Sequence, residues 1–147
     1  MDMIDPQTPL TSISDAFYKC ILTTHGFIVV SMNNTPRSTL YLYDERTAEK
    51  GPNEVISCVH DYISSRLVST IKELDIWTDG CGGQCWNNYF PMYFELLVDP
   101  NSKLHKKLPK LQWVSIWRNP RVHTYMETDS EGGWLAEQGR KVLLDRE

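Results

Sequence analysis

Four segments of the chain have the spacing of apolar residues that is typical of β-strands. Residues 17–32 are apolar and β-branched with Thr-His-Gly in the middle, and they predict one long bent strand or a hairpin. Residues 38–45 alternate leucine with tyrosine, which predicts a further strand. Residues 74–78 and 111–117 are short apolar runs. The run at 74–78 is apolar on both faces, as expected of a central strand that is covered on both sides.

Three other segments have the spacing of helices. Pro52 suits the first turn of a helix, and residues 53–67 place five apolar side chains on one helical face: Val55, Val59, Tyr62, Ile63 and Leu67. Residues 86–98 predict an aromatic-rich helix or a broken helix, and residues 131–144 predict a final helix. The order strand, strand, helix, strand, helix, strand, helix predicts an α/β fold in which helices pack on a mixed sheet.

Length and composition indicate one globular domain over residues 1–147, with 41% apolar and 23% charged residues. The net charge of −4 does not by itself indicate a strong binder of nucleic-acid backbone. No apolar run approaches the ~18 residues of a membrane span, and the first residues have no secretory pattern, so we expect an intracellular protein without a membrane partner. The four cysteines are then expected to be free thiols: Cys20, Cys58, Cys81 and Cys85.

The stretch Ile-Trp-Thr-Asp-Gly-Cys-Gly-Gly, residues 76–83, places a lone carboxylate directly after the predicted central strand. Asp79 is followed by three glycines in four positions, which permit a tight turn and the close approach of a ligand to the main chain. Ligands of α/β sheets gather at the carboxyl ends of the central strands. Asp79 is therefore the first candidate for a site residue.

Two further acids are placed so that they could join Asp79. Glu54 opens the predicted helix 53–67, and Asp129 precedes the last helix, with Glu131 and Glu137 nearby. Carboxylates that converge on one sheet edge repel each other and need a cation, and Mg²⁺ prefers such oxygen ligands. Two such ions can activate a water and stabilise the leaving oxygen of a phosphodiester. The alternative is that Asp79 is a turn residue and that Glu54 only complements the helix dipole.

Four motifs in register resemble a domain family derived from DDE-type transposases of the ribonuclease H-like superfamily: "AFYK" (16–19), "YLYDERTAEKGPNEVISC" (41–58), "TDGCGGQCWNN" (78–88) and "HTYMETD" (123–129). The resemblance implies a ribonuclease H-like fold, in which helices flank a five-stranded mixed sheet and acids at the strand ends bind Mg²⁺ or Mn²⁺. In this chain Asp79 matches the acid after the central strand, Glu54 the helix-borne acid and Asp129 the late acid. The early acid falls on Asp2, or less well on Asp5.

The chain departs from the family in several places. Nothing precedes Asp2 except Met1, so we expect the first strand to be truncated, missing or borrowed and the domain to be incomplete at its N-terminus. The family has Gly-His-Ser-Tyr-Met where this chain has Val-His-Thr-Tyr-Met at residues 122–126, Asn where it has Cys85, and Arg where it has Lys50. These departures favour a weak or inactive isolated enzyme.

Other residues support competing interpretations. Cys81, Cys85 and His123 could be zinc ligands, but structural zinc sites use four ligands and paired cysteine spacings, so zinc is not expected. Cys58 and His60 are close in sequence, yet side chains two apart on a helix do not face each other, which favours an inert buried thiol.

Several residues are candidates for weak contacts with nucleic acid. His123 could orient a carboxylate or a water, and a structural role is equally compatible with its position. Lys106 and Lys107 belong to a basic stretch that could touch a phosphate backbone, although a solvated loop explains it as well. The five tryptophans are expected to lie mostly in the core, and Trp86, just past the glycine turn, is the one we expect to stack on a base.

Two functions follow. The first is a transposase-derived, ribonuclease H-like domain for divalent-metal-dependent cleavage or strand transfer on nucleic acid, with Asp79, Asp129, Glu54 and Asp2 as catalytic metal ligands. The second is a catalytically degenerate relative that acts as a binding or interaction module. We favour DNA over RNA and the nucleus over the cytoplasm, and the residues leave activity and oligomeric state open.

Overall fold

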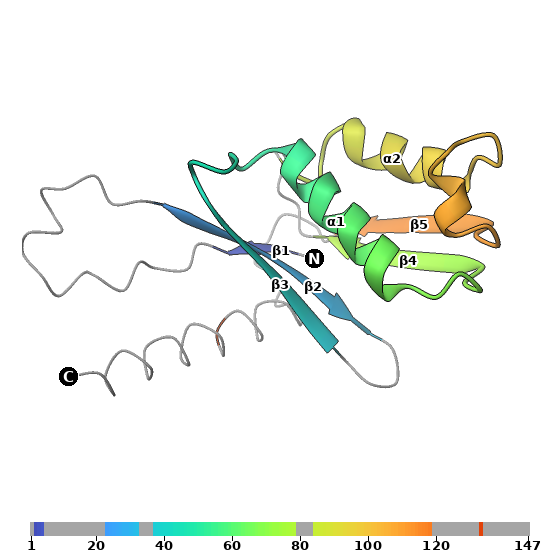
Figure 1. Ribbon diagram of the computed structural model, residues 1–147, viewed down its shortest axis with the longest axis horizontal. Helices are drawn as coiled ribbons and strands as arrows, with labels where there is room; N and C mark the ends of the chain where they lie inside the picture. The colour runs from blue at the N-terminus through green and yellow to red at the C-terminus, as the bar shows by residue number, and fades with distance from the viewer. Residues whose placement is uncertain (1, 5–22, 33–36, 79–83, 119–132, 134–147) are drawn as a thin grey trace, which may run out of the picture. The chain divides into compact units, whose positions relative to one another are not determined.

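The computed structural model describes residues 2–4, 23–32, 37–78, 84–118 and 133 (Figure 1). The chain divides into two compact units. One consists of residues 2–49 and 125–147 and is called the antiparallel unit. The other, called the α/β unit, consists of residues 50–124 together with Met1. The broad expectation of a mixed α/β protein is confirmed, because the two units hold two small sheets and two α-helices among their described residues.

The antiparallel unit contains a three-stranded sheet in the order β1-β2-β3. Its strands are β1 (Asp2–Ile4), β2 (Thr24–Ser31) and β3 (Arg37–Asp44), and each pairs antiparallel with its neighbour. Phe27, Ile28 and Val29 in β2 are buried, as the apolar and β-branched composition of this strand predicts. The described part of the predicted segment 17–32 therefore forms one strand that begins at Thr24.

A short first strand is present. The three residues of β1 include Asp2, whose register partner is Ile28 on β2, and Ile4 lies opposite Gly26. The expectation that the family's first strand is truncated or missing stays a prediction. Its ladder with β2 fixes the backbone of Asp2 on one side.

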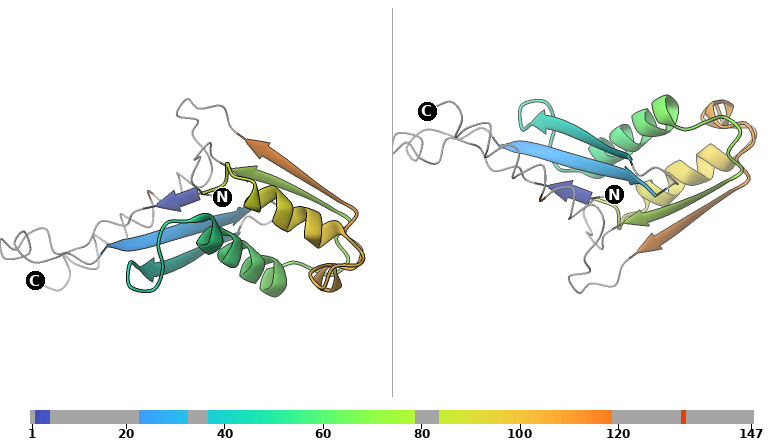
Figure 2. Two further views of the ribbon diagram at one scale, coloured as in Figure 1. Left: turned by 90° about the horizontal axis from the view of Figure 1, so that it is seen from above. Right: turned by 90° about the horizontal axis from the view of Figure 1, so that it is seen from below.

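The α/β unit contains β4 (Glu73–Thr78) and β5 (Trp113–Arg118), which pair in parallel over their full length. The connection between them holds α2 (Tyr89–Val98) and the short 3₁₀ helix η2 (His105–Lys107), so the unit is a strand-helix-strand crossover. The helix α1 (Pro52–Arg66) precedes β4 and contacts α2 (Figure 2).

The first helix begins and ends as its sequence predicts. Gly51 caps its start with extended backbone, and Pro52 takes the first helical position, where its missing N–H costs nothing. Val55, Val59 and Ile63 recur on one helical face and are buried. The helix ends at Arg66, after which the Leu67 N–H donates to the Ile63 carbonyl.

The two faces of the β4–β5 sheet differ, which corrects the expectation that the strand at 74–78 is covered on both sides. Ile76 and Thr78 on one face of β4 are buried. Asp75 and Trp77 on the other face are exposed, with Trp77 at 51%. No described helix covers that second face. The apolar run at residues 74–78 does not by itself indicate that one of its faces is exposed.

The expectation that the tryptophans are mostly core residues is wrong for the four that the structure describes. Trp77 is 51% exposed, Trp86 43%, Trp113 66% and Trp117 50%, while Trp134 lies outside the described residues. Trp77 and Trp117 are register partners and stack with ring centroids 5.5 Å apart at 16°. Stacking lets the two rings shield each other without a covering helix.

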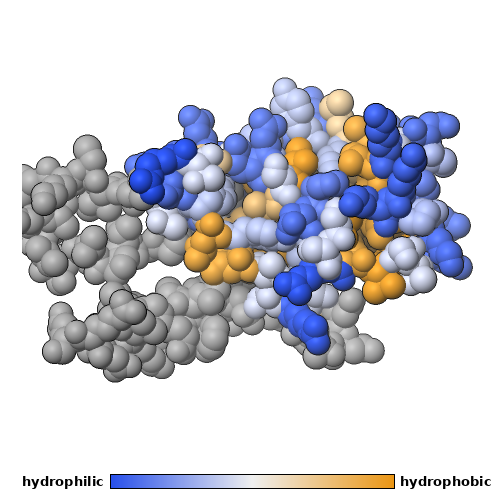
Figure 3. All heavy atoms as spheres, in the orientation of Figure 1, coloured by the Kyte–Doolittle hydropathy of each residue, from blue (hydrophilic) through white to orange (hydrophobic). Residues whose placement is uncertain are grey.

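Apolar side chains also reach the surface elsewhere. Figure 3 shows hydrophilic side chains over much of the face turned to the viewer, with apolar patches between them.

Within the described part of the chain, no helix is long and apolar enough to cross a membrane.

Candidate functional site at the carboxyl edge of β4 and β5

The structure describes some of the predicted site residues and not others. Asp79, Asp129 and His123 lie outside the described residues, and so do Asp5 and Cys81. Asp2 lies in β1, where its backbone is described, and Glu54 lies in the first turn of α1. Among the residues that are described, no group of three or more His, Cys, Asp and Glu side chains is placed to hold a metal ion.

Glu54 folds back toward the start of its own helix. A Cβ atom built on Gly51 would meet the Glu54 Oε2 atom at 2.7 Å, so the carboxylate lies against the glycine that caps α1. A carboxylate at this position complements the positive end of the helix dipole. The glycine gives it room to lie there, and Glu54 thus has a local structural role whatever else it binds.

The carboxyl ends of β4 and β5 lie side by side because the two strands are parallel. Thr78 and Arg118 are the last residues of their strands and are register partners. Asp79 follows Thr78 directly in the sequence. The first predicted acid is thus one residue beyond a strand end that meets a second strand end at the same edge, which is where α/β sheets bind ligands.

Two polar atoms at this edge are buried and have no hydrogen-bond partner among the described residues. Thr78 is 0% exposed and its Oγ1 atom has none, and the Arg118 Nε atom is buried and also has none. Native proteins satisfy most buried polar groups, so an unsatisfied one indicates a functional or strained position. Here both groups can donate, and they sit on neighbouring strands in register.

Arg118 also contacts Trp86. Its guanidinium carbon lies 4.8 Å from the centre of the Trp86 ring, which is within the range of a cation–π interaction. Among the described residues, the Arg118 guanidinium takes part in no ion pair. The ring holds the flat face of the guanidinium and leaves its N–H edge for an acceptor.

Trp86 is held by the residues that follow it. Asn87 Nδ2 donates to the Gln84 carbonyl at 2.7 Å, and Asn87 Oδ1 accepts from the Phe90 N–H at 3.1 Å. Phe90 is 0% exposed, so this amide anchors the turn to the buried start of α2. Since Arg118 occupies one face of the Trp86 ring, a base cannot stack on that face.

Lys106 and Lys107 lie at the other end of the α/β unit. They are exposed residues of η2, which lies between the end of α2 and the start of β5. His105 Nδ1 contacts the Leu97 carbonyl at 3.0 Å, and Leu108 is buried, so the segment is fixed to α2. The carboxyl edge of β5 is about 17 Å from its start at the usual rise of a strand. The two lysines and the Arg118–Trp86 pair are therefore separate features.

The thiol of Cys58 is unsuited to nucleophilic chemistry. The pKa of the Cys58 thiol is raised to about 11, mainly by partial burial and in the same direction by the charges of Asp61 and Glu54. His60 does not turn toward it, because its Nδ1 atom lies 3.0 Å from the Tyr93 hydroxyl. The interpretation of Cys58 as an inert thiol is thus supported. For the zinc alternative, Cys85 is buried, while Cys81 and His123 lie outside the described residues.

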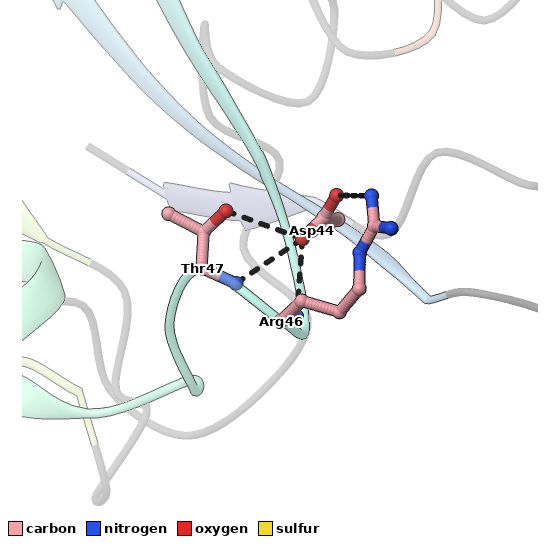
Figure 4. Close-up of polar contacts among 3 residues, drawn as sticks. All are labelled: Asp44, Arg46 and Thr47. Atoms are coloured by element: carbon pink, nitrogen blue, oxygen red, sulfur yellow. Dashed lines mark hydrogen bonds and ion pairs between the residues drawn. The ribbon is translucent and has the colours of Figure 1, made fainter.

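A perturbed carboxylate in the antiparallel unit has a structural explanation. Asp44 ends β3 and accepts hydrogen bonds from the Arg46 side chain at 2.7 Å and from the Thr47 N–H and hydroxyl (Figure 4). The hydrogen bond from Arg46 is the main cause that lowers the pKa of Asp44 to about 2. These bonds close the turn after β3, so Asp44 stabilises a turn and needs no ligand.

Sequence reasoning missed Arg118 and Thr78. Thr78 is the last residue of the predicted strand 74–78, and Arg118 directly follows the apolar run 111–117; these positions at the ends of predicted strands were the only signal. Comparison of the chain with protein-family models, with curated proteins and with solved structures gives no match.

Proposed function

We propose that the chain is a ribonuclease H-like, transposase-derived domain that cleaves or joins phosphodiesters of DNA with the help of Mg²⁺ or Mn²⁺. The observation that carries this proposal is that β4 ends at Thr78 beside the end of the parallel strand β5, and that Asp79 follows Thr78 directly in the sequence. An acid at this edge is placed for ligand chemistry in α/β folds generally.

The order of the elements supports a ribonuclease H-like arrangement. Three antiparallel strands are followed by a helix, then by a parallel strand pair joined through a second helix. The described residues hold five strands in two sheets, one antiparallel and one parallel, and the resemblance implies a sheet of five strands that mixes both directions.

The chemistry of the proposed ligands fits a hard divalent cation. Asp2, Glu54, Asp79 and Asp129 supply only carboxylate oxygens, which Mg²⁺ and Mn²⁺ bind in proteins. Asp2 belongs to a paired strand and Glu54 to the first turn of α1. When bound, such an ion supplies charge stabilisation for a phosphoryl group and a more acidic water.

The carboxylates of this chain would hold and orient the cation and the phosphate beside it. Rigid elements matter because phosphoryl transfer tolerates misplacement of a fraction of an ångström. Glu54 would have to leave its position against Gly51 to bind a metal, which a rotation of its flexible side chain allows. A DNA substrate favours the nucleus as the site of action.

Two measurements on the full chain test this function. Mg²⁺ or Mn²⁺ should raise the melting temperature of the wild type by binding the folded state, and the Asp79→Asn variant should lose most of that rise. Cleavage of labelled single- or double-stranded DNA by this chain, which we expect to be weak, should require the metal and fall at least about a hundredfold in Asp79→Asn. Glu73→Gln is the matched control, because Glu73 is an exposed acid at the opposite end of the same strand.

The possible outcomes separate the two functions. Metal-dependent cleavage that Asp79→Asn abolishes and Glu73→Gln leaves unchanged supports the enzyme. Equal metal shifts in wild type and Asp79→Asn would place the metal elsewhere and overturn the proposed site. DNA binding without cleavage under any metal would leave the degenerate binding module as the function.

A further inference from the structure

One face of the β4–β5 sheet presents tryptophan rings and carboxylates to the surface. Alternate residues of a strand point to the same face of a sheet, and side-by-side residues of neighbouring strands share that face. Trp77, Trp113 and Trp117 are 51%, 66% and 50% exposed there. The six residues of this tryptophan face are Glu73, Asp75 and Trp77 of β4 and Trp113, Ser115 and Trp117 of β5.

The exposed area of the tryptophan face suits a short segment of another chain. Three large aromatic side chains that are about half exposed leave on the order of 300 Å² open. A stable interface between two folded domains takes about 800 Å² from each partner, so a second copy of this chain would find too little area on these rings. Exposed apolar patches of this size on a single protein are often functional.

The charge of the tryptophan face is wholly negative. Its charged residues are Asp75 and Glu73, and none of its six residues is a cation. Asp75 is exposed, and among the described residues its polar contact is with the Trp117 Nε1–H, which donates to Asp75 Oδ1 at 3.4 Å. A carboxylate accepts several hydrogen bonds, so Asp75 has capacity for the donors of a partner. A face of this charge attracts a basic segment and repels a nucleic-acid backbone.

An arginine side chain fits the pair of Asp75 and Trp117. A guanidinium binds a carboxylate through two parallel N–H bonds, and its flat face stacks on an indole ring. Arg118 makes the second of these contacts elsewhere in this unit, where its guanidinium carbon lies 4.8 Å from the centre of the Trp86 ring. Lysine carries the charge without the flat face, so it would use less of the site.

We propose that the tryptophan face binds an extended, arginine-containing segment of a partner protein, with one guanidinium on Asp75 and Trp117 and a second on Trp113. Trp113 and Trp117 begin and nearly end β5, and at the rise of a strand they lie about 13 Å apart. Arginines at every fourth position of an extended peptide have the same spacing. This inference goes beyond the proposed function and does not depend on it, because it needs neither a metal ion nor DNA.

The probe is a synthetic peptide of three Arg-Ser-Gly-Ser repeats, titrated into the isotope-labelled full chain. The indole N–H signals in the NMR spectrum, assigned with single Trp→Phe variants, report on each ring separately. The signals of Trp113 and Trp117 should shift and saturate, while the signal of Trp86, which is not on this face, should stay in place. The same peptide with lysine for arginine should bind about threefold more weakly, and with glutamine for arginine it should not bind.

Two variants of the tryptophan face test the contacts. Asp75→Asn keeps the oxygen that accepts from Trp117, so it should leave the urea midpoint nearly unchanged and weaken peptide binding about threefold. Trp113→Leu removes an exposed ring and should weaken binding by a similar factor, which keeps the test valid if Asp75→Asn lowers the midpoint. Glu95→Gln is the matched control, because Glu95 is an exposed acid on α2 and lies outside the tryptophan face.

The outcomes separate the arginine segment from other occupants. Weaker binding by Asp75→Asn and Trp113→Leu, with Glu95→Gln equal to the wild type, supports the inference. Variants that all bind the peptide equally, a glutamine peptide that binds as well, or a wild type that does not bind overturn it. Oligothymidylate that shifts these indole signals where the peptide does not would identify a nucleic-acid surface, and shifts with protein concentration alone would identify a second copy; either result overturns the inference. Metal-dependent cleavage is unaffected by these outcomes, so the proposed function stands or fails separately.

Discussion

His60 and Tyr93 join the two helices of the α/β unit through a polar contact. The His60 Nδ1 atom lies 3.0 Å from the Tyr93 hydroxyl, and their rings meet edge to face with centroids 6.0 Å apart. Tyr93 is buried and His60 half-buried, so water replaces this hydrogen bond poorly. The contact fixes how α1 and α2 are aligned.

Replacing Tyr93 by Phe should therefore destabilise the protein. The substitution keeps the ring and removes only the hydroxyl, so the free energy of unfolding should fall by about 1 kcal/mol, the usual value of one hydrogen bond. Urea denaturation measures the change. Tyr89→Phe on the same helix is the control, because Tyr89 is 62% exposed and should change stability little. Equal effects of the two substitutions would show that the His60 contact contributes nothing.

The same tyrosine predicts a loss of stability at high pH. Burial raises the pKa of Tyr93 to about 12, above its usual 10.0. A group whose pKa is raised by folding stabilises the fold below its unfolded pKa, and that contribution disappears as the pH rises through the folded value. The free energy of unfolding should decrease between about pH 10 and pH 12, and phenolate absorbance should show one tyrosine that ionises late. Tyr93→Phe should lack this late phase.

Cys58 should react slowly with alkylating reagents in the folded protein. Its thiol has a pKa of about 11 compared with an ordinary 9.0, so its thiolate is about a hundredfold scarcer at pH 8. Higher intrinsic nucleophilicity of a more basic thiolate recovers part of this, which leaves a net slowing of about tenfold. Labelling with N-ethylmaleimide, resolved by peptide mass spectrometry, compares Cys58 in the native and the urea-unfolded chain. Equal rates in the two states would contradict the burial of this thiol.

The Asp44 turn should weaken only in strong acid. The hydrogen bond from Arg46 is the largest cause that holds the pKa of Asp44 at about 2 instead of 3.8. A carboxyl whose pKa is lowered by folding stabilises the fold above its unfolded pKa, and the contribution is lost as the pH falls from about 4 toward 2. Carboxyl NMR titration should find this low value in the wild type and a value between 2 and 3.8 in Arg46→Gln, since the bonds from Thr47 remain. Arg37→Gln, at the other end of β3, should leave the titration of Asp44 unchanged.

Local elements of this fold could be predicted from the sequence because each depends on neighbouring residues. The spacing of Val55, Val59 and Ile63 predicts the buried face of α1, and Pro52 with Gly51 predicts its start. A helix needs only its own period and its caps for such a prediction. The strands β3, β4 and β5 were predicted within two residues of their ends for the same reason.

Features that depend on distant residues could not be predicted. The pairing of Thr78 with Arg118 requires the register of two strands that lie 40 positions apart in the sequence, and periodicity within one strand does not contain it. The exposure of Trp77 depends on whether another element covers its face, which the apolar pattern of β4 does not state. Of the predicted acids, Glu54 was placed correctly at a helix start, while its contact with Gly51 depends on a side-chain rotamer.

The stacked pair of Trp77 and Trp117 should contribute to stability and give a spectroscopic signal. Their rings lie 5.5 Å apart and nearly parallel at 16°, and the Trp117 Nε1 atom donates to Asp75 Oδ1 at 3.4 Å. An aromatic pair adds about 0.5–1.5 kcal/mol beyond the area that it buries, so Trp117→Ala should lower the free energy of unfolding by at least this amount. Two indole rings this close also couple their electronic transitions, which predicts an exciton couplet in the circular dichroism spectrum.

Conservative substitutions isolate that signal. Trp77→Phe and Trp117→Phe should each abolish the couplet, because either change leaves only one indole in the pair. Trp113→Phe is the control, since Trp113 is 66% exposed and its Nε1 atom donates to Ser115 rather than to either ring of the pair. A couplet that survives both Trp77→Phe and Trp117→Phe would show that the rings do not stack in solution. Loss of the couplet in all three variants would contradict the assignment to this pair, because Trp113 would then be part of the coupled system.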